Sequence, residues 1–268
     1  MYSLYDVNGL VMWTSDELRL RRQFTDNLVA AVTKALFQTN PAWTIVEIEA
    51  PLLMPRSLIN PNYTNEDIFV QESATPTDAQ LVLRPETTPG SYAAARMLFD
   101  THTGTKPPLC VWQMGKSFRR EQDQPSKHMR LKEFYQLEFQ CIYTDDTMND
   151  YHGALLEPVR KSIEDILALP TRIVDSDRLP SYSEITKDVE AWNSDKWMEI
   201  ASISRRNDFP GTFTFSGKKG NVERGLKVAE CAVGMDRILY NYFERINGAA
   251  HSASRPPFWA DDGVDQTD

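Results

Sequence analysis

The sequence lacks any apolar run of about eighteen residues, the length that an α-helix needs to cross a bilayer. Its first residues, MYSLYDVNGLVMWTSDE, lack the basic stretch followed by an apolar stretch that marks a secretory signal. With 41% apolar and 25% charged residues, the composition is that of an ordinary globular protein. We therefore expect a cytoplasmic setting and no membrane partner.

Cysteine is scarce. Cys110, Cys141 and Cys231 are too few and too scattered for a disulfide framework or a CxxC metal knuckle. An odd number of thiols suits a reducing compartment, where disulfides are rare. We predict that all three side chains lie in the core.

Positive charge is also in deficit. The chain has 29 lysines and arginines against 38 aspartates and glutamates, which gives a formal net charge of −9. Such a balance argues against a surface that holds nucleic acid by bulk electrostatics alone. Any contact with RNA must then be local.

The length of 268 residues favours one sizeable core. The sequence has no internal repeat and no low-complexity linker. Its final segment, DDGVDQTD, is polar and acidic, as in a frayed tail. We predict one principal domain over residues 1–250 and a poorly ordered tail over residues 251–268.

A long helix is predicted near the N-terminus, because Thr14 and Glu17 form a T-x-x-E capping box. The apolar residues that follow recur every fourth position and form one stripe: Leu20, Phe24, Leu28, Val32 and Leu36. After the break at Pro41, alternation over residues 44–49 predicts a strand, and Pro51 stops its hydrogen-bond ladder.

The remaining patterns alternate between strands and helices. They predict a loop at 72–79, strands at 81–83, 111–114, 134–143, 198–203 and 227–232 and near Ile173 and Val189, and helices at 91–98, 146–169 and 235–245. The second helix contains Pro158, where we expect a kink. A polar, basic excursion containing residues 122–127 joins two of the strands. Mainly non-crossover strands predict an α+β fold with an antiparallel sheet flanked by helices.

The segment KEFYQLEFQ at 132–140 has two distinct faces. Because side chains alternate in a strand, Phe134, Gln136, Glu138 and Gln140 share one face, and the apolar residues between them share the other. An aromatic plate beside acceptors can stack a flat base and hold an ammonium group, and Arg119 of the preceding FRRE can fork onto a phosphate. The alternative is a solvated sheet face with ordinary salt bridges.

The segment ECAVGMDRILY at 230–240 places Gly234 at a strand-to-helix junction, with Arg237 in the first helical turn. Backbone N–H groups and the helix dipole favour anions there, so this end suits a triphosphate. The alternative is that Arg237 only pairs with Asp236.

The segment EIASISRRNDF at 199–209 offers oxygen ligands for Mg²⁺, Glu199 and Ser202. Residues three apart point to opposite faces of a flat strand, so a shared metal requires a bulge between them. The alternative is an edge-strand carboxylate without a metal. RPET at 84–87 is equally open, because an arginine and a carboxylate at a proline-bounded turn are often only a cap.

Five segments in this order, RPETTPG, GKSFRRE, LKEFYQLEFQ, EIASISRRNDF and AECAVGMDRIL, resemble the catalytic core of the class II aminoacyl-tRNA synthetases. Pro51 with the helix and strand before it resembles the first signature motif, FRRE with KEF the second, and VGMDR the third. LRPETTPG, QMGKSFRRE and LPSYSEITKDVEAW are most similar to the glycyl enzyme. The resemblance covers about residues 15–245 and implies activation of a small amino acid, with glycine favoured, by ATP.

The resemblance also implies roles at the nucleotide end. Arg119 would hold the α-phosphate and the amino acid carboxylate, and Arg237 the far phosphates, which makes them the catalytic candidates. Phe134 would stack on adenine, Glu121 would contact the adenine side, and Arg206 would face the nucleotide. The implied Mg²⁺ ligands are Glu199 and Ser202.

At the amino-acid end, the resemblance implies that Glu86, Glu138 and Glu230 ring the α-ammonium group. Where the glycyl pattern has Glu-Pro-Ser, this sequence has Glu230-Cys231-Ala232, so Ala232 lacks a hydroxyl expected near the substrate.

The resemblance implies the acceptor end of a tRNA and a second copy of the chain, in a two-fold homodimer, as partners. The family normally appends an anticodon-binding domain after the third motif, but only about twenty residues follow Arg245, so we expect none. Two alternatives remain open. The activated amino acid could pass to a carrier protein, peptide or nucleobase, or the chain could be a non-catalytic paralogue that acts as a regulatory or binding subunit.

Overall fold

The computed structural model describes residues 5–7, 10–71, 80–101, 104–120, 130–177, 179–193, 196–217 and 220–248. Its helices are α1 (Ser15–Thr39), α2 (Thr88–Thr101), α3 (Tyr151–Leu167) and α4 (Met235–Gly248), with a short 3₁₀ turn at Arg56–Leu58. Its strands are β1 (Tyr5–Val7), β2 (Leu10–Met12), β3 (Thr44–Glu47), β4 (Leu53–Pro55), β5 (Leu81–Leu83), β6 (Leu109–Phe118), β7 (Glu133–Thr144), β8 (Thr171–Asp175), β9 (Ser183–Asn193), β10 (Lys196–Arg206), β11 (Thr212–Gly217) and β12 (Gly220–Gly234).

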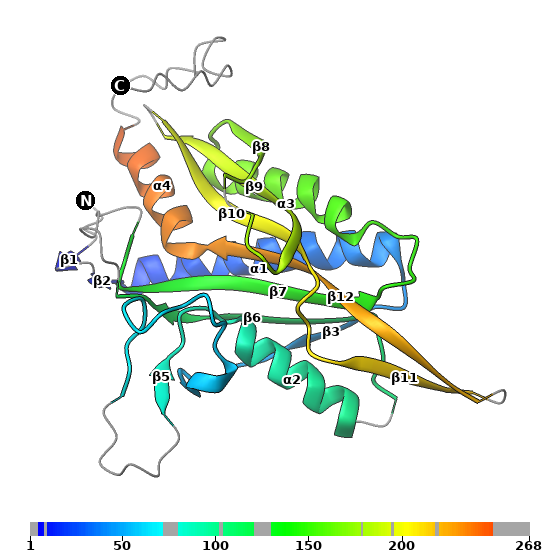
Figure 1. The fold of residues 1–268 in the computed structure, drawn as a ribbon. Coiled ribbons are helices and arrows are strands. Elements are labelled where there is room, and N and C mark those ends of the chain that lie inside the picture. Colours follow the sequence, from blue (N-terminus) through cyan, green and yellow to red (C-terminus); the bar gives the residue numbers. More distant parts are fainter. Residues whose placement is uncertain are drawn as a thin grey trace, which may run out of the picture.

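One sheet of eight strands organises the fold (Figure 1). The strand order is β3-β6-β7-β12-β10-β9-β8, and β11 pairs with β12 beside this path. The pairs are antiparallel except β3 with β6, where the chain passes through β4, β5 and α2 before it returns. The expected sheet flanked by helices is confirmed, with this one parallel pair at its edge.

Helix α1 begins as the capping pattern predicts. The Thr14 backbone N–H donates to Glu17 Oε2 at 2.5 Å, which satisfies a donor that the first helical turn cannot pair. The predicted stripe is buried from Phe24 to Leu36, and Leu20 packs partly buried beside it.

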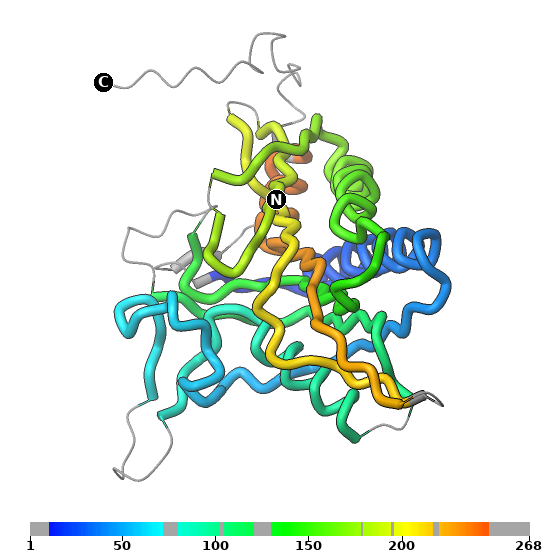
Figure 2. The backbone as a smooth tube through the Cα atoms, turned by 45° about the vertical axis from the view of Figure 1, so that its right-hand side comes forward, coloured from blue at the N-terminus to red at the C-terminus, as the bar shows by residue number. Residues whose placement is uncertain are grey.

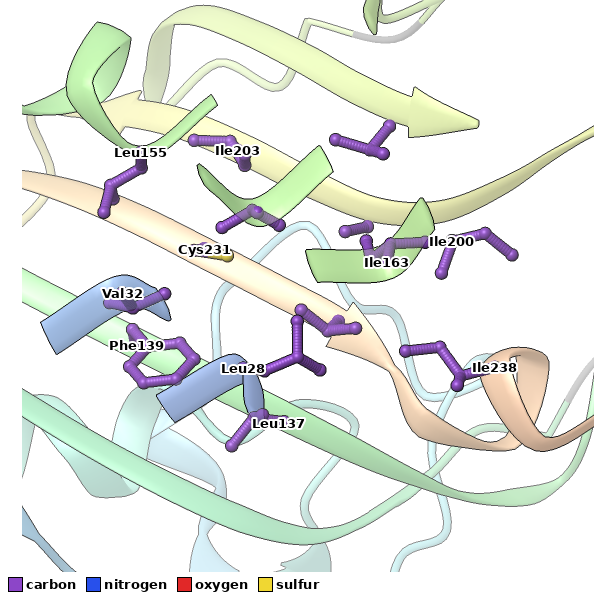
Figure 3. Packing of buried hydrophobic residues seen from close by; sticks show 14 of the residues in the cluster. Leu28, Val32, Leu137, Phe139, Leu155, Ile163, Ile200, Ile203, Cys231 and Ile238 are labelled. Carbon is purple, nitrogen blue, oxygen red and sulfur yellow. The ribbon is translucent and has the colours of Figure 1, made fainter. Parts of the chain in front are cut away.

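The main core lies between one face of the sheet and α1, α3 and α4. Leu28 and Val32 of α1 pack over Leu137 and Phe139 of β7, beside Cys231 of β12 (Figure 3). The predicted core face of KEFYQLEFQ is therefore confirmed. The three cysteines are free and buried, as predicted.

The opposite face of the sheet changes character along its strands. At one end Tyr92 and Ala95 of α2 pack against apolar residues of that face, among them Ile142 and Val228. Two residues along β7 and β12, the same face carries Gln140 and then Glu138, both buried and polar. This polar part of the face is the floor of the site described below.

Two helix boundaries differ from the sequence prediction. The helix predicted from residue 146 begins at Tyr151, because Asp150 is its N-cap and accepts the Gly153 N–H at 3.1 Å. Helix α3 continues through Pro158. Helix α2 begins at Thr88 instead of residue 91, since Pro89 fits the first turn, where its missing N–H costs nothing.

The hairpin of β11 and β12 was not predicted at its full length. Only residues 227–232 were predicted as a strand, whereas β12 begins at Gly220 and pairs with β11 from Thr212 to Gly217. The hairpin extends away from the rest of the fold (Figures 1 and 2). In β11 the half-buried Phe213 and Phe215 alternate with exposed hydroxyl residues, a strand signal that the sequence prediction passed over, whereas residues 220–224 of β12 are all exposed and carry no such alternation.

Several predictions fall on residues outside the described ranges: the loop at 72–79, Glu121, the excursion at 122–127 and the tail at 251–268. In the described part of the chain, no helix has both the length and the apolar character needed to span a membrane.

Candidate active site

A cavity of about 660 Å³ opens on the polar part of the sheet face. Strands β7, β9, β10 and β12 supply its floor, and the segments before α2 and after β6 supply its walls. Every described residue predicted for the site lines this one cavity: Glu86, Arg119, Phe134, Glu138, Glu199, Ser202, Arg206, Glu230, Ala232 and Arg237.

The register of the strands determines which side chains form the floor of the cavity. Ala232 of β12 lies opposite Glu138 of β7 on one side and Ser202 of β10 on the other. Two residues earlier, Glu230 lies between Gln140 and Ser204 in the same way. Because side chains two apart share a face, these rows form one continuous polar surface.

Three carboxylates gather at one end of the cavity. Both oxygens of Glu138 accept hydrogen bonds, from the hydroxyls of Thr87 and Thr88 and from the Gln140 amide. The Gln140 amide also donates to Glu230 Oε1 at 2.9 Å. Glu86 Oε2 accepts the hydroxyl of Tyr63 at 3.3 Å.

The electrostatics of this end favour a cation. Burial, reinforced by the charges of Glu230 and Glu86, raises the pKa of Glu138 to about 7. Burial likewise raises the pKa of Glu86, although Arg206 and Arg119 oppose the shift. A bound ammonium group would stabilise the ionised carboxylates, so the pocket suits a small amine.

Arg206 holds the carboxylate of Glu230 in place. Its Nη1 donates to Glu230 Oε1 at 2.7 Å, while Nε and Nη2 bond to the two oxygens of Asp208 at 3.0 and 2.7 Å. Its guanidinium carbon lies 4.0 Å from the ring centre of Tyr182, and the residue is only 2% exposed. All three nitrogens thus have carboxylate partners inside the protein, and its contact with a nucleotide stays a prediction.

Arg119 follows β6 and reaches the cavity wall. Its backbone N–H pairs with Lys132 O at 3.0 Å, its Nε donates to Pro85 O at 3.1 Å, and its Nη2 donates to the Tyr63 hydroxyl at 3.1 Å. Its guanidinium carbon lies 5.1 Å from the ring centre of Phe134. The cation and the aromatic plate that the sequence indicated are therefore neighbours.

The RPET segment is more than a cap. Arg84 is 1% exposed, and its Nε and Nη1 donate to Lys116 O at 2.8 Å and to Ala50 O at 3.0 Å. The backbone at Gly115 comes so close that a Cβ there would lie 2.2 Å from Arg84 Nη2. Arg84 therefore fixes the segment that carries Glu86 against β6.

A bulge in β10 brings the predicted metal ligands onto one face. The pairing of β10 with β9 passes from Glu199 directly to Ala201, so Ile200 is the extra residue. Both Glu199 and Ser202 consequently line the cavity. The bulge that the spacing of these two residues required is present.

Arg237 pairs with Glu199 and not with its neighbour in sequence. Its Nη1 lies 2.9 Å from Glu199 O and 3.1 Å from Glu199 Oε1. Asp236 instead accepts the backbone N–H of Tyr135. The structure therefore contradicts the alternative in which Arg237 only pairs with Asp236.

Residues 69–246 match the family model described as the tRNA synthetase class II core domain (G, H, P, S and T). The chain belongs to this class II synthetase core family.

Relatives with curated descriptions include glycine–tRNA ligases. The enzyme of Mycoplasmopsis synoviae (strain 53) is 31% identical over 175 residues, which is 59% of this chain and 38% of the relative. That of Mycoplasma capricolum is 26% identical over 194 residues, 67% of this chain and 41% of the relative. The chain thus spans about two fifths of the length of these relatives. A solved prolyl-tRNA synthetase from Cryptosporidium parvum, complexed with halofuginone and AMPPNP, shares the fold with a TM-score of 0.66 at 14% identity, over 90% of this chain and 49% of that one.

The oxygen donors around Ser202 fit the Mg²⁺ that the class II synthetase core implies. Within the described ranges, no three His, Cys, Asp or Glu side chains converge as they do in an all-protein metal cage. Mg²⁺ does not need such a cage, since it usually binds one or two carboxylates together with substrate phosphates. Ser202 lies opposite Asp188 in the register of β9 and β10, so the serine hydroxyl and the Asp188 carboxylate offer oxygen atoms to the same part of the cavity.

Several residues that line the cavity were not singled out from the sequence. Asp188 and Glu190 of β9 lie beside the predicted metal ligands, and Tyr63, Thr88 and Tyr182 line the same cavity. Thr186, Asp188 and Glu190 alternate along β9, and this pattern could have indicated Asp188 and Glu190. Tyr63 has no such signal, because it reaches the site from an irregular segment.

Proposed function

We propose that this chain activates a small amino acid, with glycine favoured, by reaction with ATP, and transfers the aminoacyl group to a tRNA. One observation carries the proposal: a single cavity joins a three-carboxylate pocket to Arg119, Phe134 and Arg237. The pocket suits the α-ammonium group, and the arginines and the aromatic ring suit a nucleotide triphosphate.

The reaction would be an in-line attack of the amino acid carboxylate on the α-phosphate, which releases pyrophosphate and forms an aminoacyl-adenylate. No general base is required, because the attacking carboxylate is already ionised at neutral pH. Arg119 would hold both reacting groups and stabilise the charge that develops between them. Arg237, at the N-terminal end of α4, would receive the departing pyrophosphate.

Glu199 and Ser202 would hold Mg²⁺, with Asp188 opposite Ser202 on the neighbouring strand β9. When bound, the ion would neutralise charge on the phosphates. Phe134 would stack on the adenine.

Glycine is favoured for two reasons. The ammonium end is crowded and negative, so it selects a small zwitterion by size and charge. The relatives described as glycine–tRNA ligases supply independent support.

For the acceptor we propose the 3′ end of a tRNA, on the strength of the same relatives. The net charge of −9 favours a second candidate, in which the acceptor is a carrier protein, a peptide or a nucleobase. Charging assays with total tRNA separate the two, since efficient aminoacylation of tRNA would exclude the second.

We also propose a two-fold homodimer formed through the segment around Pro51. Leu52, Leu53 and Leu58 expose 41%, 46% and 49% of their surface there, which suits coverage by a second copy. Sedimentation at micromolar concentration tests this, and a monomer under those conditions would contradict it.

The central experiment is ATP–pyrophosphate exchange with each of the twenty amino acids. We expect exchange with glycine and loss of exchange in Arg119→Ala. Absence of exchange with every amino acid would reject the proposed activity. Calorimetric titration with ATP and Mg²⁺ would then test the non-catalytic alternative, which predicts binding of neither.

A further inference from the structure

The β10 side of the amino-acid pocket is built from small residues, and most of them carry hydroxyls. Ser204 and Ser202 of β10, Thr186 of β9 and Ala232 of β12 all line the cavity. Ser204 lies directly beside Glu230 in the register of β10 and β12, on the side away from Glu138. A substituent on the Cα of a bound amino acid that pointed toward β10 would therefore meet a small, polar wall.

Three hydroxyls form a chain that leads from this wall into the protein. Ser204 Oγ lies 3.0 Å from Thr186 Oγ1, which lies 3.0 Å from Ser183 Oγ. At the inner end, Ser183 Oγ donates to backbone carbonyls, Ile185 O at 2.9 Å and Arg205 O at 3.2 Å.

Counting protons fixes the direction of the hydrogen bonds between these three hydroxyls. A hydroxyl has one proton and two lone pairs, and a carbonyl can only accept. The proton of Ser183 is used on a carbonyl, so Thr186 must donate to Ser183, and Ser204 must in turn donate to Thr186. The proton of Ser204 therefore points into the wall, and only lone pairs of its oxygen face the cavity.

The α-ammonium group does not need this acceptor. Glu86, Glu138 and Glu230 already surround the position where it would bind. Among the described residues, the donors to Glu230 all bond to Oε1, so Oε2 has no donor there. The Ser204 oxygen is therefore placed to accept a hydrogen bond from a second donor, one on the side chain of the bound amino acid.

We propose that Ser204 is a specificity-determining acceptor for a hydroxymethyl side chain, so that the site takes L-serine in addition to glycine and prefers it over L-alanine. This inference rests on the proposed amino-acid activation. Ala232 is compatible with it, because this neighbour of Glu230 along the cavity face of β12 adds only a methyl group and no hydroxyl that could compete for the substrate.

The test measures pyrophosphate exchange with glycine, L-serine and L-alanine for the wild type and for Ser204→Ala. A single neutral hydrogen bond changes an equilibrium by about fivefold, so we expect wild-type kcat/KM for serine to exceed that for alanine by about fivefold. In Ser204→Ala this ratio should fall to about one. The substitution leaves no donor without a partner, because Thr186 keeps its acceptor Ser183.

Thr25→Val is the matched control. Thr25 is also buried, and its hydroxyl bonds to Arg21 O within α1 at 2.9 Å, away from the cavity. Its loss should leave the serine-to-alanine ratio unchanged. A ratio that fell equally in this control would overturn the role of Ser204.

The outcomes separate this inference from the proposed function. Exchange with glycine but equal kcat/KM for serine and alanine in the wild type would overturn the inference and leave the activity standing. Absence of any exchange would reject the activity, and calorimetric titration with L-serine and L-alanine would then decide the acceptor. Tighter binding of serine would support it, and equal binding would overturn it.

Discussion

Arg237 and Glu199 join α4 to β10 through one guanidinium nitrogen, which lies 2.9 Å from the backbone oxygen of Glu199 and 3.1 Å from its carboxylate Oε1. The two side chains are 28% and 49% exposed. Ion pairs this accessible to water contribute only about 0–1 kcal/mol to stability. Substrate phosphates could therefore replace Glu199 as the partner of Arg237 at little energetic cost. A cation could likewise replace Arg237 as the partner of Glu199.

Replacing Arg237 by alanine should weaken ATP binding without unfolding the protein. A charge-assisted hydrogen bond to a phosphate is worth about 1.5–3 kcal/mol, so KM for ATP should rise by at least about tenfold. Pyrophosphate exchange at varied ATP concentration measures this, and thermal unfolding should change little. Arg96→Ala is the control, because Arg96 pairs with Asp100 at 3.5 Å outside the cavity. An unchanged KM for ATP in Arg237→Ala would remove Arg237 from the nucleotide site.

Arg206 should behave in the opposite way, as a determinant of stability. Arg206→Met would leave Glu230 and Asp208 without their cation, and breaking a buried pair costs about 3–5 kcal/mol. Urea denaturation measures this loss. In Arg206→Met with Glu230→Gln, the loss should be smaller than the sum of the two single losses.

The neighbouring arginine provides the control for this prediction. Arg205 pairs with Asp150 at 2.9 Å, with exposures of 33% and 61%. Arg205→Met should cost no more than about 1 kcal/mol. Equal losses for the two arginines would show that burial of the Arg206 cluster does not govern its stability.

The close approach of α2 to the segment before β4 gives a prediction about packing. A Cβ added at Gly90 would lie 2.3 Å from the Cβ of Ala50. Gly90→Ala should therefore destabilise the protein by about 1–3 kcal/mol, as overpacking of a core does. Combining it with Ala50→Gly removes the clash and should restore most of the loss in urea denaturation. A double variant no more stable than Gly90→Ala would mean that another contact causes the effect.

The sequence was sufficient where a local period determined the outcome. Alternation in KEFYQLEFQ placed Phe134 and Glu138 on the cavity face, and the spacing of Glu199 and Ser202 required the bulge that β10 contains. Such features depend on neighbours in the chain, which a single sequence displays. The N-cap at Asp150 was also readable, although the helix was placed too early.

The rest of the site depends on contacts between distant segments. Arg84 bonds to Ala50 and Lys116, and Arg206 bonds to Glu230, in each case across at least 24 positions of the chain. No local pattern distinguishes a buried arginine of this kind from an exposed one. The roles of Arg84 and Arg206 in positioning carboxylates therefore became visible only in three dimensions.

Glu138 gives the fold a pH dependence of definite sign. Its pKa is about 7 in the folded protein, against 4.5 for an ordinary glutamate, so between these values the folded state binds more protons than the unfolded state. The contribution of Glu138 to stability therefore falls as pH rises from about 4.5 to about 7 and stays constant above. Asp236, whose pKa burial also raises to about 7, acts in the same direction.

Glu138→Gln should abolish only the contribution of Glu138 to this pH dependence. Relative to the wild type, the variant should therefore gain on the order of 1–3 kcal/mol of stability between pH 5 and pH 8 in urea denaturation. Glu157 is a control of opposite sign, because its hydrogen bond with Arg160 lowers its pKa, so Glu157→Gln should lose stability relative to the wild type as pH rises. Parallel stability curves for the wild type and Glu138→Gln would show that this carboxyl ionises alike in the folded and unfolded states.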